Sequence, residues 1–141
     1  MNGGMDFRES FSRRIRLLAG LDEKTCYDTL LARIRFTPGV FLLARRLNGL
    51  GASCAIVSGG FRPIAEYVQH HLGFEYCFAN VLSTANGRLT GGFDGELIDA
   101  GRKVEILKKL RETLKIPRAN VHGSSLCYSY RLGNCSWRRS Q

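Results

Sequence analysis

The stretch Ile56-Val57-Ser58-Gly59-Gly60-Phe61 decides the fold class of this chain. An apolar run over 53–57 leads into a hydroxyl and two glycines, and 61–71 then follows a helical pattern. A short apolar run that ends in this way predicts a strand buried on both faces of a sheet. The glycines allow a turn and let a ligand approach the backbone closely. The stretch therefore predicts a strand–turn–helix unit of an α/β fold.

Helices and strands alternate along the rest of the chain. The apolar periodicity predicts helices over 7–19, 22–34, 40–47 and 103–114, and strands over 76–82 and 88–93. The pair Asn86-Gly87 predicts a tight hairpin turn between these two strands. The order favours a layered α/β domain with parallel pairing. The opening helices have no strand partner, so we expect them to form a small helical cap that precedes the sheet.

Two helices are predicted in more detail. Asp6 and Glu9 match a capping box at the start of the first helix, because a short polar side chain there is followed three residues later by Glu. In the helix over 103–114, an apolar stripe at helical spacing is expected to face inward, and its members are Val104, Leu107, Leu110 and Leu114.

The chain is strongly basic, with 21 Lys and Arg against 12 Asp and Glu and a net charge of +9. Such a charge suits nucleic acid, an anionic small substrate or a solvated surface. The basic residues are scattered in short pairs such as Arg45-Arg46 and Lys108-Lys109 instead of one long tract. Charge alone therefore gives nucleic acid little support as a partner.

The cysteines and the apolar runs indicate in which cellular compartment the chain is expected. The five cysteines form no Cys-x-x-Cys pair, which argues against a zinc site and fits reduced thiols. No apolar run reaches membrane-spanning length, and the first residues lack the pattern of a secretory signal. We therefore expect a cytoplasmic chain with no membrane partner.

Ser58 carries the sharpest chemical signal. A hydroxyl at the end of a buried strand, next to the start of a helix, can donate to a phosphoryl oxygen, and helix N-termini attract anions. The alternative is that Ser58 only caps the helix and that the glycines only form a turn; both interpretations can hold at once. Lys103 and the arginines of the first helix could also balance phosphate charge. Most such side chains are simply solvated, so these signals are weak alone.

Several strings carry a resemblance to a known family. They occur in order over about residues 1–120, and they are Gly-Met-Asp-Phe-Arg-Glu-Ser-Phe (4–11), Thr-Pro-Gly-Val (37–40), Val-Ser-Gly-Gly-Phe (57–61), Phe-Ala-Asn (78–80), Asn-Gly-Arg-Leu-Thr-Gly (86–91) and Arg-Lys-Val-Glu-Ile-Leu (102–107). Together they resemble the phosphoserine phosphatases of the haloacid dehalogenase (HAD) superfamily, bacterial type.

The resemblance implies a partial HAD-like, Rossmann-like parallel sheet with helices on both faces, preceded by part of a small helical cap. On this basis, 1–36 is a partial cap and 37–120 a partial α/β core. Residues 121–141 are a divergent tail for which we expect little order.

The resemblance also implies roles for individual residues. Ser58 and Gly59 would bind the phosphoryl group, and Lys103 would be the catalytic cation that neutralises it. The implied reaction is hydrolysis of O-phosphoserine to serine and phosphate in serine biosynthesis, through an aspartyl-phosphate and with Mg²⁺ as cofactor.

Substrate selection would come from the cap. By the same resemblance, Arg14 would pair with the substrate carboxylate and Phe7 would pack over the serine moiety. Met1 occupies the position of a cap methionine that lines this pocket. The implied small-molecule partner is therefore phosphoserine.

The sequence departs from the family at two motifs. It has no Asp-x-Asp, which would supply the nucleophile and the acid/base, and no acidic residue after Glu112, where further Mg²⁺ ligands are expected. We therefore assign no metal ligand, expect a chain truncated at both ends, and expect it to be inactive alone. Open alternatives are a phosphoserine- or phosphate-binding module, a complementing half of a split enzyme, a self-associating fragment, or a basic nucleic-acid-interacting protein.

Overall fold

The computed structural model describes residues 6–123 and 128–130. The helices are α1 (Phe7–Arg16), α2 (Glu23–Leu31), α3 (Val40–Gly49), α4 (Arg62–Leu72), α5 (Ala100–Thr113) and the 3₁₀ helix η1 (Arg118–Asn120). The strands are β1 (Ile34–Phe36), β2 (Ala55–Phe61), β3 (Tyr76–Ala85), β4 (Arg88–Asp94) and β5 (Tyr128–Tyr130). No helix in the described ranges is long and apolar enough to cross a membrane.

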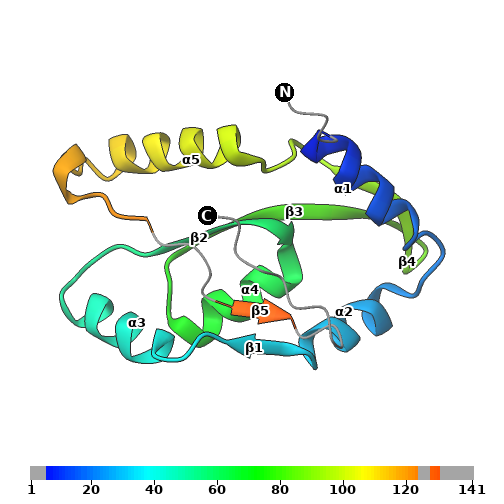
Figure 1. The fold of residues 1–141 in the computed structure, drawn as a ribbon, viewed down its shortest axis with the longest axis horizontal. Coiled ribbons are helices and arrows are strands. Elements are labelled where there is room, and N and C mark those ends of the chain that lie inside the picture. The colour runs from blue at the N-terminus through cyan, green and yellow to red at the C-terminus, as the bar shows by residue number, and fades with distance from the viewer. Residues whose placement is uncertain (1–5, 124–127, 131–141) are drawn as a thin grey trace.

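The main sheet has the order β2-β3-β4. Strands β2 and β3 are parallel, and α4 connects them, while β3 and β4 form an antiparallel hairpin. The hairpin turns at Asn86 and Gly87, whose φ angles of 52° and 74° are those that a tight primed turn requires. Helices α4 and α5 lie on opposite faces of the β2–β3 pair (Figure 1). The predicted α/β class, with parallel pairing and helices on both faces, is confirmed.

A second, two-stranded sheet joins β1 to β5. The strands are antiparallel, with Ile34 opposite Tyr130 and Phe36 opposite Tyr128. The sequence predicted a helix as far as Ile34, but α2 ends at Leu31 and the chain extends into β1. Little order was expected after residue 120, yet β5 lies in that segment. Pairing gives the backbone groups of β1 the hydrogen-bond partners that an extended segment needs.

Two apolar clusters hold the elements together. The larger one packs α4 against β2 and α3, and its centre is formed by Ile64, Ala65 and Val68, which have no exposed surface. The smaller one joins Phe11 and Ile15 of α1 to the β3–β4 hairpin. Burial of this face of α1 fixes the position of the helix relative to the sheet, because apolar burial is the main force that stabilises such contacts.

The structure corrects three details of the helices. Asp6 precedes α1, but its side chain makes no capping hydrogen bond, so the expected capping box does not form. Helix α1 also ends at Arg16 instead of residue 19. In α5, Val104 and Leu107 are 51% and 42% exposed, whereas Ile106 is buried. Apolar residues occur on two faces of α5, and the face that docks on the sheet is the one centred on Ile106.

Candidate functional site

The loop Ser58-Gly59-Gly60 forms a bulge near the carboxyl end of β2. Between Val57 and Phe61, β2 has three residues where β3 has only Ala79, because Val57 pairs with Phe78 and Phe61 with Asn80. Such a bulge bends the strand and moves its extra residues out of the ladder. The loop therefore projects at the carboxyl edge of the parallel pair, where open α/β sheets bind ligands.

Ser58 stabilises this loop from within. The Gly60 N–H donates to Ser58 Oγ at 3.0 Å. The residue that caps α4 is Phe61, which makes no side-chain capping bond, and Pro63 lies in the first turn. Ser58 is therefore not the N-cap of α4, and the interpretation of its hydroxyl as a simple helix cap is wrong. The first-turn N–H groups of α4, just beyond Phe61, still make this end of the sheet favourable for an anion.

Phe7 lies directly against the loop. A Cβ atom placed on Gly59 would be 3.3 Å from Phe7 Cζ. The Phe7 ring also neighbours that of Phe11, at 6.1 Å between centroids, and Phe11 packs edge-on against Phe61 and Phe93 at 6.2 and 5.6 Å. The structure thus brings two of the sequence-predicted site residues, Phe7 and Gly59, together, and Phe7 belongs to a group of aromatic rings from α1, β2 and β4.

Arg14 lies two turns after Phe7 and therefore on a similar face of α1. Its guanidinium bonds to the backbone oxygen and to Oγ of Ser10, each at 3.3 Å. The side chain is exposed, and these contacts stay within its own helix. The structure places Arg14 on the helix that covers the loop, without a described contact to Ser58 or Gly59.

Lys103 lies one turn into α5 and is exposed. The segment that leads into α5 touches the loop, because the Ile98 backbone oxygen would be 3.4 Å from a Cβ atom on Gly59. Asp99 then caps α5 by accepting from the Arg102 N–H at 2.8 Å. In the described part of the chain no ion pair involves the Lys103 ammonium group. Lys103 therefore lies five residues after Ile98, which is close to Gly59, on a helix that starts near the loop.

Asn80 is a site residue that sequence reasoning missed. It is only 2% exposed, and its amide donates to the Gly59 oxygen at 3.0 Å while accepting from the Ile98 N–H at 2.8 Å. The signal was present, since Asn80 is a polar residue in a strand that is otherwise largely apolar at that point. A buried amide is costly unless both of its ends are hydrogen-bonded.

Metal ligands do not gather at the loop. Within residues 6–123, no three side chains of His, Cys, Asp or Glu lie close enough together to hold a metal ion. The carboxylate of Asp99, beside Ile98, is engaged in capping α5. The described residues around the loop therefore do not fit a Mg²⁺ site by themselves. Met1 lies outside the described residues.

Two of the thiols are not activated. Burial raises the pKa of Cys26 and of Cys77, so both remain protonated near neutral pH. A thiol nucleophile requires the opposite shift, toward a lower pKa. Neither cysteine is therefore a candidate nucleophile.

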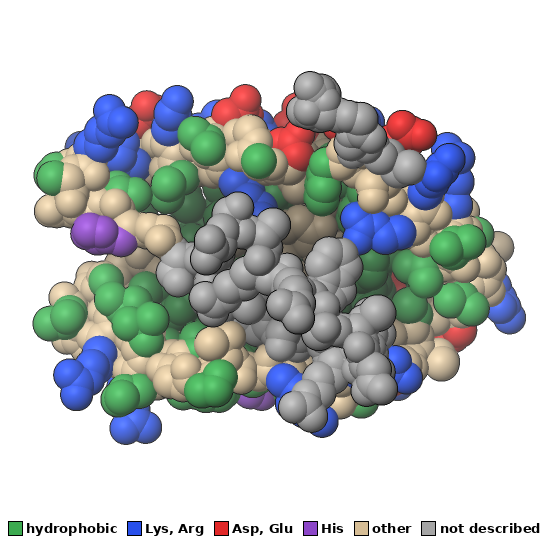
Figure 2. Space-filling view, in the orientation of Figure 1, with side chains coloured by type: hydrophobic (Ala, Val, Ile, Leu, Met, Phe, Trp, Pro, Cys, Tyr) green, Lys and Arg blue, Asp and Glu red, His purple; other side chains and the backbone are tan. Residues whose placement is uncertain are grey.

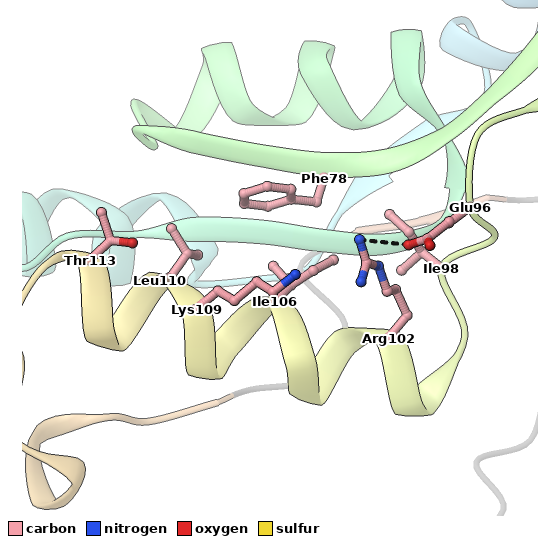
Figure 3. Close-up of a pocket in the computed structure, with 8 residues that line it drawn as sticks. All are labelled: Phe78, Glu96, Ile98, Arg102, Ile106, Lys109, Leu110 and Thr113. Carbon is pink, nitrogen blue, oxygen red and sulfur yellow. Dashed lines mark ion pairs between the residues drawn. The ribbon is translucent and has the colours of Figure 1, made fainter.

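A groove lies between α5 and the sheet, where Phe78 of β3 faces α5 (Figure 3). It has a volume of about 440 Å³, and Phe78, Ile106 and Leu110 give it an apolar lining. At one end Arg102 pairs with Glu96 at 2.7 Å, and its pKa is raised chiefly by its hydrogen bond to Glu105. None of the sequence-predicted site residues lines this groove, although Ile98, whose backbone oxygen lies close to Gly59, does.

Positive charge on the face in Figure 2 is divided among separate groups. The Lys and Arg side chains visible there do not form one patch. A nucleic-acid interface usually concentrates basic side chains on one face or stripe. This distribution does not favour the nucleic-acid alternative.

Comparison with known proteins decides the family. Residues 2–129 match the model of the haloacid dehalogenase-like hydrolase family. The chain belongs to this family. The HAD-like chain is 43% identical over 116 residues to a probable phosphoserine phosphatase of Schizosaccharomyces pombe, a match that covers 81% of the chain and 39% of that protein. It is 38% identical over 117 residues to a phosphoserine phosphatase of Streptomyces coelicolor, covering 83% of the chain and 28% of that protein.

Solved structures agree with this assignment. The HAD-like chain superposes on the unliganded probable phosphoserine phosphatase of Vibrio cholerae with a TM-score of 0.76 and 29% identity, over 84% of this chain and 36% of that one. The resemblance found in the sequence is thereby confirmed. The chain spans well under two thirds of the length of each of these three relatives.

Proposed function

We propose that this HAD-like chain supplies the substrate-binding part of a phosphoserine phosphatase, which converts O-phosphoserine to serine and phosphate in cytoplasmic serine biosynthesis. The observation that carries the proposal is the contact of Phe7 with the Gly59 loop. It places an aromatic side chain of the cap helix over a glycine-rich loop at the carboxyl edge of a parallel strand pair. The names of the relatives, and the likeness to a solved substrate-bound phosphoserine phosphatase complex at 33% identity, support this substrate.

Each predicted site residue that the structure describes has a physical part in this proposal. Ser58 and the backbone at Gly59 contact the phosphoryl oxygens, because a hydroxyl and glycine N–H groups suit an anion. Lys103 balances the phosphate charge from the first turns of α5. Phe7 covers the small serine moiety, and Arg14 on the same helix reaches its carboxylate. For Arg14 this requires its guanidinium to leave Ser10.

Turnover needs groups that this sequence does not contain. The sequence has no Asp-x-Asp, the motif that the family resemblance implies for the nucleophile and its acid/base. Mg²⁺, the implied cofactor, would supply charge neutralisation at the phosphoryl group when bound. We therefore expect this chain to bind phosphoserine and to release phosphate from it slowly or not at all.

Titration calorimetry of the 141-residue chain with O-phosphoserine, inorganic phosphate and serine tests the proposal. We expect phosphoserine to bind more tightly than either fragment, since it alone engages both the loop and the cap. Lys103→Ala should weaken phosphoserine and phosphate binding by about tenfold, the effect of losing one charge-assisted contact. Lys108→Ala, which removes the same charge further along α5, is the matched control and should bind normally.

Two results would contradict the proposal. Equal or absent binding of all three compounds would show that the loop and the cap do not form a phosphoserine site. Phosphate release from phosphoserine at a rate typical of enzymes would contradict the expected inactivity and would point to an unrecognised nucleophile in this chain.

A further inference from the structure

Asn80 is held at both ends of its amide. Among residues 6–123, Asn80 is the one polar residue that is buried, with an exposed fraction of 2%. Its Nδ2 donates to the Gly59 oxygen and its Oδ1 accepts from the Ile98 N–H. One side chain therefore satisfies a backbone acceptor of the loop and a backbone donor of the segment that leads into α5.

The bulge in β2 explains why a side chain is needed there. The ladder between β2 and β3 shifts register between Val57 and Phe61, so Gly59 has no residue of β3 directly opposite. A buried backbone oxygen without a partner is costly. The Asn80 amide takes the place of a ladder bond, and it does so for an oxygen whose residue also contacts Phe7.

The second bond extends this effect to α5. Ile98 lies two residues before the start of α5, and its oxygen would be 3.4 Å from a Cβ atom on Gly59. Asn80 thus fixes the spacing between the loop and the N-terminus of the helix that carries Lys103. The two elements come from distant parts of the chain, and Asn80 bonds to a backbone group beside each.

We propose that Asn80 is a positioning residue of the phosphate site, which holds the Ser58-Gly59-Gly60 loop and the start of α5 in the register that an anion requires. The inference rests on the proposed function, and it concerns a residue that would not itself touch the substrate. Removing the Asn80 bond to Gly59 should weaken anion binding even where the chain stays folded.

The variant Asn80→Asp tests the positioning role of Asn80 without removing the whole side chain from the core. An ionised carboxylate still accepts from the Ile98 N–H but cannot donate to the Gly59 oxygen, whereas a protonated carboxyl can do both. Burial favours the protonated form. The groups that Asn80 contacts, at Gly59 and Ile98, carry no titratable side chain, and the nearest acid of that segment, Asp99, caps α5. Affinity relative to wild type should therefore recover as the pH is lowered.

The experiment titrates ¹⁵N-labelled chain with inorganic phosphate and with O-phosphoserine, following the amide signals of the loop. Where its carboxyl is ionised, Asn80→Asp should bind both ligands about tenfold more weakly than wild type, the effect of one lost buried hydrogen bond. The difference in affinity between the variant and wild type should become smaller as the pH is lowered. The matched control is Asn48→Asp, which changes an amide that donates to the Leu72 oxygen at 3.2 Å, a helix C-terminus in another part of the fold. It should bind both anions like the wild type.

Wild-type affinity of Asn80→Asp at every pH, including pH values at which its carboxyl is ionised, or an equal loss in Asn48→Asp, would overturn the inference. If the wild-type chain binds neither anion, the proposed function fails, and amide hydrogen exchange then decides the role of Asn80. In Asn80→Ala the Ile98 and Gly60 amides should exchange at least about tenfold faster. Unchanged exchange at both would show that Asn80 does not hold the loop.

Discussion

Phe7 and Gly59 lie in contact, although one begins α1 and the other lies in the bulge of β2. A Cβ atom on Gly59 would be 3.3 Å from Phe7 Cζ and 3.4 Å from the Ile98 oxygen. The loop is thus enclosed by α1 on one side and by the segment before α5 on the other. The φ angle of Gly59 is not positive, so the backbone conformation alone does not favour glycine, and a side chain at this position would instead press against the Phe7 ring.

Gly59→Ala should therefore disturb the site more than the fold. The added methyl group pushes the partly exposed Phe7 ring aside by a few tenths of an ångström, so the loss of unfolding free energy should not exceed about 1 kcal/mol, the low end of what overpacking costs. Phosphoserine affinity should fall as well. Gly49→Ala is the control, because a Cβ atom there meets nothing within 4 Å. Urea unfolding and calorimetry check both; an unchanged Gly59→Ala variant would show that the Phe7 contact is loose in solution.

Arg14→Ala should distinguish binding of the substrate carboxylate from binding of its phosphate group. If Arg14 pairs with the carboxylate, phosphoserine affinity falls by about tenfold, the effect of losing a charge-assisted hydrogen bond, while inorganic phosphate binds as before. Arg13→Ala removes the same charge from the neighbouring position of α1 and should leave both affinities unchanged. Since Arg14 is exposed and bonds to Ser10 alone among described residues, unfolding free energy should change by less than about 0.5 kcal/mol. Equal effects of the two variants on phosphoserine would refute a specific role.

Ile64→Ala probes the larger apolar cluster. The Ile64 side chain has no exposed surface, so its truncation removes buried contacts and leaves a cavity. Unfolding free energy should fall by about 2–5 kcal/mol. Val104→Ala is the surface control, because Val104 is 51% exposed, and its effect should stay within about 0.5 kcal/mol. Denaturant unfolding measures both, and comparable losses would mean that α5 buries Val104 in solution.

Local signals predicted most of the frame of the molecule. The apolar run that ends at Ser58 gave β2, the glycines gave the loop, and Asn86-Gly87 gave the hairpin, because each depends on neighbouring residues in the chain. The buried face of α5 was not predictable in this way. Ile106 and Leu107 are equally apolar, and only docking against the sheet decides that Ile106 is buried and Leu107 exposed.

The site was predictable in part for the same reason. Ser58 and Gly59 are adjacent in sequence and were found together. The family resemblance implied only that Phe7 packs over the serine moiety, and the contact of Phe7 with Gly59 was not predicted. Asn80 was missed because its role depends on two long-range bonds, to Gly59 and Ile98, that no local pattern encodes. In a sequence, a polar residue within an otherwise apolar strand is the feature that indicates such a bond.

Tyr27 should make the stability of the chain depend on alkaline pH. Burial, with smaller contributions from Glu23 and Cys26, raises its pKa from 10.0 to about 12. The folded state favours the neutral phenol, so this contribution to stability is complete below the unfolded pKa and is lost as the pH rises through the folded value. Tyr27→Phe cannot ionise and should lose less unfolding free energy than wild type between pH 10 and pH 12. Denaturant unfolding of both proteins across that range measures the difference, and parallel curves would show that Tyr27 ionises as easily in the folded chain as in the unfolded one.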